Sequence, residues 1–190
     1  MIDLIILASL LDGPKHGYAL KKQAGMIFNH SQLHNNLVYP LLRRFTSQGW
    51  VTKKSAPGER GQTRQQYALT AAGRRALLQR LNAFAEKEAQ SGEEFLVRVG
   101  LFELLPPEVR ERILAARQQV LARREEHFAH LQQMELGAYG SEVVDFLRQR
   151  VKDELAWLRR LRRIAKNQSP AESNSNANMA AERRRRRGSA

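Results

Sequence analysis

Between residues 35 and 44 lie five side chains that can contact DNA bases or backbone phosphates: Asn35, Asn36, Tyr39, Arg43 and Arg44. Asn pairs well with adenine, and Arg pairs with guanine or binds phosphate. Asn36 can equally be only a helix cap. Tyr39 can pack its ring on the core, with or without its hydroxyl on a phosphate. Arg43 shares the face of Tyr39, whereas Arg44 points about 100° away and suits a phosphate or an acidic neighbour.

A second basic group lies in a hairpin rich in Gly and Pro. It consists of four cations and the single acid Glu59, the cations being Lys53, Lys54, Arg60 and Arg64. A charged run usually only faces solvent, but this excess of cations favours contact with phosphates or the minor groove. Three lysines earlier in the chain can hold backbone phosphates: Lys15, Lys21 and Lys22.

The formal net charge of +13 is concentrated at the start of the 190-residue chain. Residues 1–80 hold 12 Lys and Arg against 3 Asp and Glu, whereas residues 81–170 hold 15 against 14. Such an imbalance suits an anionic partner. We therefore expect double-stranded DNA to bind the first eighty residues.

Other kinds of site find little support. The chain has no cysteine, which excludes disulfides, cysteine–zinc sites, iron–sulfur clusters and thiol nucleophiles. It has no Gly-rich phosphate loop, nucleophile elbow or carboxylate pair in a plausible cleft, so we expect no enzyme and no cofactor. His127 and His130 beside two glutamates could ligate a metal, but they lie in a charged helix, and we expect no metal site.

The elements that position the basic residues can be predicted from periodicity. We expect helices at 3–11, 16–27 and 36–48, strands at 50–55 and 64–69, and a long helix from Thr70 to about residue 88. The opening apolar run is too short for a membrane span or a secretory signal, which suits a cytoplasmic, nucleoid-associated protein. Three helices, a hairpin and a helix predict a winged helix-turn-helix whose third helix enters the major groove.

Within the second helix we expect a structural role for His16 and a core position for Tyr18. The third helix should bury the stripe Leu37, Leu41, Leu42 and Phe45. Pro40 is tolerated in a first turn, which places the helix start at Asn35 or Asn36, and Gly49 should end the helix.

The remaining chain predicts a helical domain. We expect helices at 93–105, 107–136 and 141–165, the last two with apolar residues every three, four or seven positions. That is more apolar surface than a two-helix hairpin hides, which favours a homodimer, although the stripes could instead pack on the first domain. Residues 167–190 are expected to be a disordered tail, whose Arg183–Arg187 either grip phosphates or are only solvated.

Four groups of residues resemble the PadR family of bacterial transcriptional regulators. They are Pro14-x-His16-Gly17-Tyr18-x-Leu20, Tyr39-Pro40-Leu41-Leu42-Arg43-Arg44, Gly49-Trp50-Val51 and Tyr67-x-Leu69-Thr70-x-x-Gly73-Arg74. The chain departs from the family at His34–Leu37, where a small Ser/Pro/Gly-rich stretch is usual, at Phe45, where leucine is usual, and at Thr46–Gln48, where an acidic pair is usual. The resemblance implies a homodimer that binds an inverted repeat at a promoter, most often as a repressor, and that a small aromatic or drug-like effector or a partner protein can release.

The sequence therefore predicts a mainly α protein with a winged helix-turn-helix DNA-binding domain at 1–80 and a helical, coiled-coil-like dimerisation domain at 81–166. An effector pocket between the two would use aromatic walls, although core packing explains the same side chains: Tyr18, Phe95, Phe102 and Trp157. The alternative function is a non-specific DNA-coating or architectural protein, which shares the basic charge but does not need a neutral second half.

Overall fold

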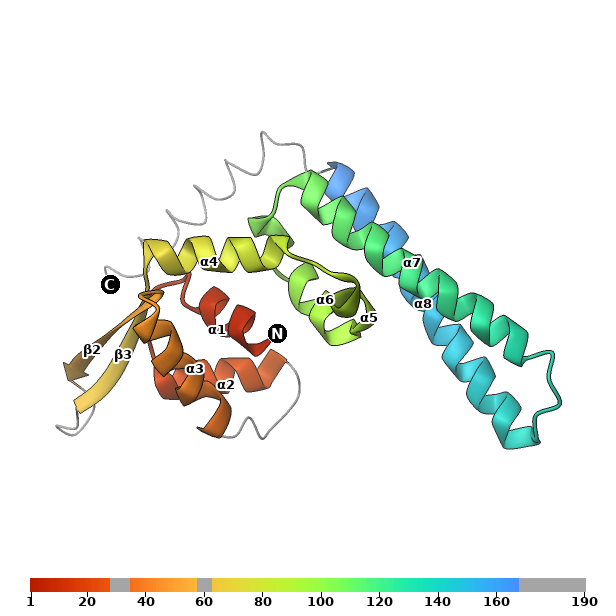
Figure 1. Cartoon of the computed structure of the whole chain (residues 1–190), viewed down its shortest axis with the longest axis horizontal. Coiled ribbons are helices and arrows are strands. Elements are labelled where there is room, and N and C mark those ends of the chain that lie inside the picture. The colour runs from red at the N-terminus through yellow and green to blue at the C-terminus, as the bar shows by residue number, and fades with distance from the viewer. Residues whose placement is uncertain (28–34, 58–62, 168–190) are drawn as a thin grey trace. The chain divides into compact units, whose positions relative to one another are not determined.

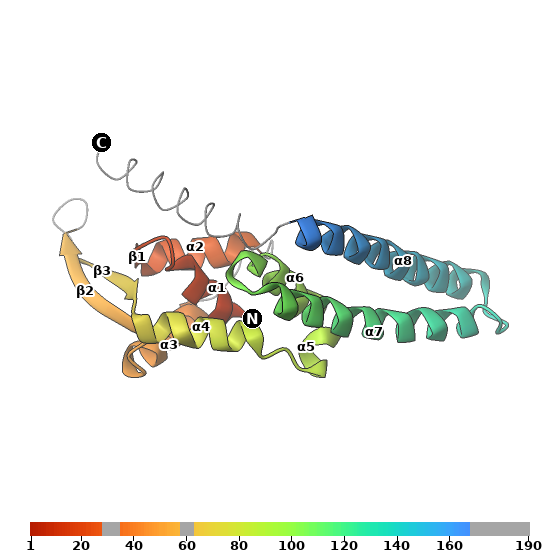
Figure 2. The ribbon, with the colours of Figure 1, turned by 90° about the horizontal axis from the view of Figure 1, so that it is seen from above.

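A computed structural model describes residues 1–27, 35–57 and 63–167. The chain divides into two compact units (Figures 1 and 2). Unit 1 comprises Met1–Ala85 and Leu96–Leu105, and unit 2 comprises Glu86–Phe95 and the described residues from Pro106 onward. The predicted domain boundaries at residues 80 and 166 stay predictions. Residues 168–190 of the predicted tail lie outside the described residues.

Four helices form the body of unit 1. They are α1 (Ile2–Ser9), α2 (Gly17–Ile27), α3 (Asn35–Ser47) and α4 (Ala71–Asn82). The apolar run of α1 is at most 3% exposed from Leu4 to Leu7, as expected for a helix that is hydrophobic on all sides. α1 packs against both α2 and α4, and α2 packs against α3. The tandem of α2 and α3 is the predicted helix-turn-helix pair.

A small antiparallel sheet completes unit 1, with strand order β1-β3-β2. Its strands are β1 (Lys15–His16), β2 (Val51–Pro57) and β3 (Thr63–Leu69). β2 and β3 form the predicted wing, which projects from the helices in Figure 1. β1 was not expected, because two residues are too short to show the alternation by which a strand is recognised. The predicted winged helix-turn-helix is thus confirmed, with an added edge strand.

The link between α3 and the wing is a Schellman motif. Gly49 has a φ of 68°, the Gly49 N–H donates to Thr46 O (3.1 Å), and the Trp50 N–H donates to Phe45 O (2.9 Å). The Phe45 and Trp50 rings stack at 5.6 Å between centroids, which is the apolar contact that accompanies this motif. Gly49 therefore ends the helix as predicted and starts β2 at a defined angle.

The structure confirms two predicted helix starts and contradicts two other details. α3 begins at Asn35, one of the two predicted starts, so Asn36 is its second residue, but Pro40 lies inside the helix rather than in the first turn. α4 ends at Asn82 instead of near residue 88, because Ala83 adopts an extended conformation (ψ 99°). The start of α4 agrees with prediction, since the Thr70 Oγ1 accepts the Gly73 N–H at 3.0 Å.

Short helices connect α4 to the long pair of unit 2. They are α5 (Glu86–Gln90), α6 (Gly92–Val99) and a 3-10 turn at Phe102–Leu104, where one helix over 93–105 was predicted. α5 is held to unit 2 by Arg117, whose Nη1 donates to Ala89 O at 2.7 Å and to Gln90 O at 3.2 Å. The division between the units falls within α6.

Unit 2 is built on α7 (Pro107–Leu131) and α8 (Ala138–Asn167), which run antiparallel side by side (Figures 1 and 2). The break predicted at 137–140 lies at 132–137 instead. Three ion pairs follow the antiparallel register, namely Glu111–Arg162, Arg117–Glu154 and Glu125–Arg148. The predicted apolar stripes face each other, and their central members are buried: Leu114, Leu121, Val144, Val151 and Leu158.

Within the described part of the chain, no helix is both long and apolar enough to cross a membrane. The same residues contain no group of three or more His, Asp or Glu side chains that could hold a metal ion.

Candidate nucleic-acid interface

One side of α3 faces the core, and this determines which side chains face outward. Val38, Leu42 and Phe45 are fully buried, so the buried stripe follows the spacing i, i+4, i+7. The predicted buried stripe is wrong at its first residue, because Leu37 is 46% exposed and Val38 is buried in its place. Arg43 and Arg44 are exposed on the outer surface.

Arg43 belongs to a cluster with two tyrosines. Burial raises the pKa of Tyr67, Tyr39 raises it further, and the positive charge of Arg43 lowers it in part. Tyr39 is 37% exposed and Tyr67 only 6%. The pairing of Arg43 with Tyr39 on one face therefore agrees with the sequence, and Tyr67 from β3 is a neighbour that the sequence analysis did not single out.

Arg44 has different surroundings. Its guanidinium carbon lies 5.5 Å from the centroid of the Phe45 ring. The two adjacent arginines thus lie near different side chains, because successive residues of a helix point about 100° apart. Asn35 and Asn36 occupy the first turn of α3, and their predicted contacts with bases stay predictions.

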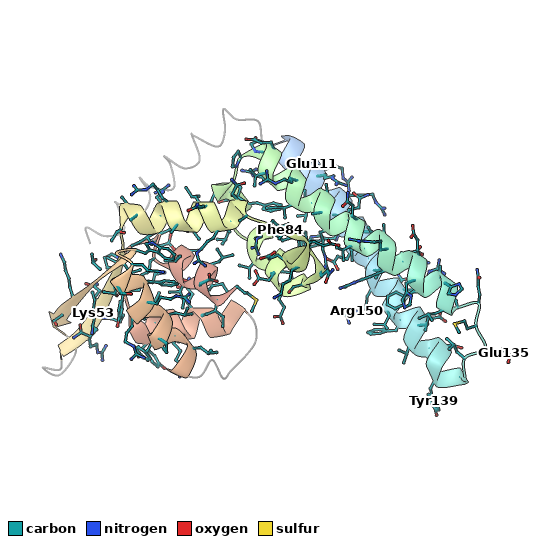
Figure 3. The ribbon with its side chains drawn as sticks, in the orientation of Figure 1. Lys53, Phe84, Glu111, Glu135, Tyr139 and Arg150 are labelled. Carbon is teal, nitrogen blue, oxygen red and sulfur yellow. The ribbon has the colours of Figure 1, made fainter. Side chains whose placement is uncertain are left out.

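The wing divides its cations between two faces. Directly paired residues of neighbouring strands point to the same side of a sheet. Lys53 and Lys15 are both paired with Tyr67, whereas Lys54 is paired with Gln66 and Arg64 with Ala56. Lys53, labelled in Figure 3, therefore lies on the face of Tyr67, and Lys54 and Arg64 lie on the opposite face. Arg60 lies outside the described residues.

The residues around the start of α2 are only partly as expected. Lys15 is half-buried and engaged, with its Nζ 3.0 Å from Gln23 Oε1 and 3.9 Å from an oxygen of Asp12. Lys21 is half-exposed and Lys22 is exposed. The His16 Nδ1 lies 3.4 Å from Gln65 O, which fits a structural role. The core position expected for Tyr18 is wrong, because Tyr18 is 72% exposed while Leu20 is buried.

The charges of α3 and the wing are of one sign. α3, β2 and β3 together contain five basic residues and no acid. Among the described residues of the neighbouring segments, Asp3 pairs with Arg80 and Asp12 pairs with Lys15, whereas Glu59 of the hairpin lies outside the described residues. Exposed cations without acids on the same elements attract phosphates and lose affinity as salt is added.

The four aromatic residues proposed for an effector pocket belong to different units. Phe95 and Trp157 meet edge to face in unit 2, with ring centroids 5.9 Å apart, while Tyr18 and Phe102 belong to unit 1. An open groove of about 570 Å³ in unit 2 is formed by α5 and α7 and includes Ala89, Ala116 and Val120. None of the four aromatic residues lines it, so the effector pocket stays a prediction.

The family comparison concerns unit 1. Residues 6–79 match the family described as the transcriptional regulator PadR-like family. No curated protein matches the chain. Among solved structures, a candidate transcriptional regulator of Thermoplasma acidophilum is 36% identical over 40% of this chain and 72% of its own, with a TM-score of 0.36.

Two other solved structures are described as PadR proteins. A PadR family regulator of Eggerthella lenta is 33% identical over 40% of this chain and 63% of its own, with a TM-score of 0.34. Bacillus subtilis PadR, solved in complex with operator DNA, is 17% identical over 85% of this chain and 96% of its own, with a TM-score of 0.42.

Proposed function

Because this chain belongs, through residues 6–79, to the PadR-like family of DNA-binding transcriptional regulators, we propose that it is a dimeric repressor that reads an inverted-repeat operator with α3. The observation that carries the proposal is the outer face of α3. There Arg43 is exposed beside Tyr39, on a helix whose other side is buried. The recognition helix of a winged helix-turn-helix presents such a face to the major groove.

In this proposal the side chains divide into two classes. Base reading belongs to the first turn and the outer face of α3, through Asn35, Asn36 and Arg43, which match adenine and guanine edges. Phosphate contacts fix the register of the protein on the duplex. They come from Tyr39, Arg44, Lys53, Lys54, Arg60, Arg64, Lys15 and Lys21. Lys15 contributes less than Lys21, because it is already engaged by Asp12 and Gln23.

The dimer in this proposal is formed through α8. The apolar positions of α7 and α8 that face each other are buried within one chain, so a second copy must meet a different surface. Tyr139, Val143 and Phe146 follow one face of α8 at spacings of four and three, and they are 90%, 57% and 61% exposed. Figure 3 shows Tyr139 pointing away from α7. A contiguous exposed apolar stripe of this kind is typical of an interface.

Repression would follow if two copies of α3 enter successive major grooves about 34 Å apart. An effector, a small aromatic molecule by the resemblance, would release DNA only to the extent that it binds the non-binding geometry more tightly. No enzymatic step and no cofactor enter this mechanism, and it would operate in the cytoplasm.

The test is fluorescence anisotropy with the DNA upstream of the gene, against scrambled DNA of equal length, at two salt concentrations. Specific binding about 10³-fold tighter than to scrambled DNA supports the proposal. Equal, steeply salt-dependent binding to both supports the alternative of a protein that coats DNA. Absence of binding to either would overturn both.

Arg43→Ala sharpens the same experiment, with Arg44→Ala as its matched control. We expect Arg43→Ala to cost about 1–3 kcal/mol on the operator and little on scrambled DNA, because it removes a base contact. Arg44→Ala should weaken both DNAs alike. An equal loss on both DNAs for Arg43→Ala would reassign that residue to a phosphate.

A further inference from the structure

The motif His16-Gly17-Tyr18 places a glycine where a side chain of α3 lies against α2. Gly17 is the first residue of α2 and is buried. A Cβ at this position would lie 2.9 Å from Tyr39 Cε1, and 3.5 Å from both Tyr39 Oη and Tyr67 Cε2. The first distance is shorter than real Cβ contacts. Any other residue at position 17 therefore requires the Tyr39 ring to move.

The Tyr39 ring is partly enclosed. Its Cε1 edge lies against Gly17, and Tyr67 also adjoins this point, while 37% of the Tyr39 residue remains exposed. Tyr39 lies one helical turn before Arg43, on the same side of α3. The preceding residue, Val38, is fully buried, so the backbone of α3 is anchored independently of Tyr39.

We propose that Gly17 is a positioning residue for operator binding, because it provides the space in which the Tyr39 ring lies and so determines where this ring and its hydroxyl are placed on α3, one helical turn before Arg43. Gly17 itself touches no DNA in this inference, which rests on the proposed function. A methyl group at position 17 meets the rotatable end of a half-exposed side chain rather than rigid backbone. The substitution should therefore move the ring and leave the fold intact.

A double-mutant cycle tests the coupling between the two residues. Gly17→Ala, Tyr39→Ala and the double variant are compared by anisotropy on the operator, and their folding is checked by circular dichroism and thermal melting. We expect each single variant to bind about tenfold more weakly, the loss of about one hydrogen bond to a charged group. The double variant should bind no more weakly than Tyr39→Ala alone, because the ring that Gly17 accommodates is already absent.

Two further variants complete the design. Gly100→Ala is the matched control, since the nearest atoms to its Cβ lie at an ordinary 3.6 Å, and it should leave operator binding unchanged. Tyr39→Phe keeps the ring and removes the hydroxyl, so it should bind as weakly as Gly17→Ala. A Tyr39→Phe variant with full affinity would contradict the role of the hydroxyl and overturn the inference.

Three other results would also overturn it. The first is unchanged operator affinity in Gly17→Ala, and the second is a loss in the double variant that equals the sum of the two single losses. The third is a Gly17→Ala protein that does not fold, since the Tyr39 ring then could not move to make room for the methyl group. If the wild-type protein does not distinguish operator from scrambled DNA, the proposed function fails and this inference fails with it. If the wild-type protein distinguishes operator from scrambled DNA but Gly17→Ala binds the operator with unchanged affinity, the inference is contradicted and the proposed function is not.

Discussion

At the scale of single residues, Asp3 shows how one carboxylate ties distant segments of unit 1. It pairs with Arg80 of α4 and with the N-terminal ammonium at 2.9 Å. The Arg80 guanidinium also lies 4.9 Å from the centroid of the Trp50 ring. The base of the wing, α1 and α4 thus meet at this one carboxylate.

The pKa of Asp3 predicts how stability depends on pH. Burial alone would raise this pKa, but the N-terminal ammonium, Arg80 and the Leu4 N–H together lower it below its ordinary value of 3.8. A carboxyl whose pKa is lowered by folding stabilises the protein above its unfolded pKa, and this contribution is lost as pH falls through the folded pKa. We expect Asp3→Asn to lower the free energy of unfolding by about 1 kcal/mol at pH 7 and by progressively less below about pH 4.

Urea denaturation at several pH values measures this difference. Asp12→Asn is the matched control, because its 3.9 Å pair with Lys15 is more exposed and should contribute little. A difference between Asp3→Asn and wild type that stays constant down to pH 2 would contradict the pH dependence.

At the scale of elements, the strand register separates two adjacent lysines of the wing. Lys53 lies on the face of Tyr67, whose pKa reflects Tyr39 and Arg43 of α3, whereas Lys54 lies on the opposite face. A duplex bound along α3 is therefore nearer to Lys53. We expect Lys53→Ala to weaken binding to operator and scrambled DNA alike, and to reduce the slope of log affinity against log salt by about 1.

Lys54→Ala is the matched comparison for this prediction, since it removes the same charge from the neighbouring position on the opposite face, and we expect it to reduce the slope less than Lys53→Ala does. Anisotropy at four salt concentrations gives the slope for each variant. If Lys54→Ala lowers the slope as much as Lys53→Ala does, the face of the wing is irrelevant and the tip alone meets DNA.

At the scale of the whole molecule, the proposed dimer needs a surface other than the one between α7 and α8. The ion pairs and the buried stripe between α7 and α8 already hold the hairpin together within one chain. Phe146 lies on the exposed stripe of α8, with the Arg150 guanidinium 5.6 Å from its ring centroid. Glu at this position would place a charge in the apolar interface of a dimer, and removing that carboxylate from water disfavours association even where Arg150 pairs with it.

We therefore expect the wild type to be a dimer by light scattering and Phe146→Glu to be a monomer that melts normally. The monomer should bind the operator much more weakly, because it loses the second recognition helix. Met134→Glu changes an equally exposed apolar residue outside α8 and should remain dimeric. A Phe146→Glu protein that stays dimeric would exclude this stripe as the interface.

Much of the protein could be predicted from sequence because its signals act over a few residues. α3 ends through bonds that Gly49 and Trp50 donate to residues three and five positions before them, and Thr70 caps α4 through the residue three positions on. The order of helices and hairpin, and the concentration of charge in the first eighty residues, are equally local properties. Together they predicted the winged helix-turn-helix, and the four short motifs between Pro14 and Arg74 predicted the family.

What only the tertiary structure decided depends on residues far apart in the chain. Tyr18 was expected inside and lies outside, Val38 replaced Leu37 in the core, and α4 stopped short of residue 88. The contact between Gly17 and Tyr39 joins residues 22 positions apart, and no periodicity reports it. A helical pattern shows that one face is apolar, but the surface packed against it selects the buried side chains. The register of the sheet likewise chose which lysine of the wing lies on the face of Tyr67.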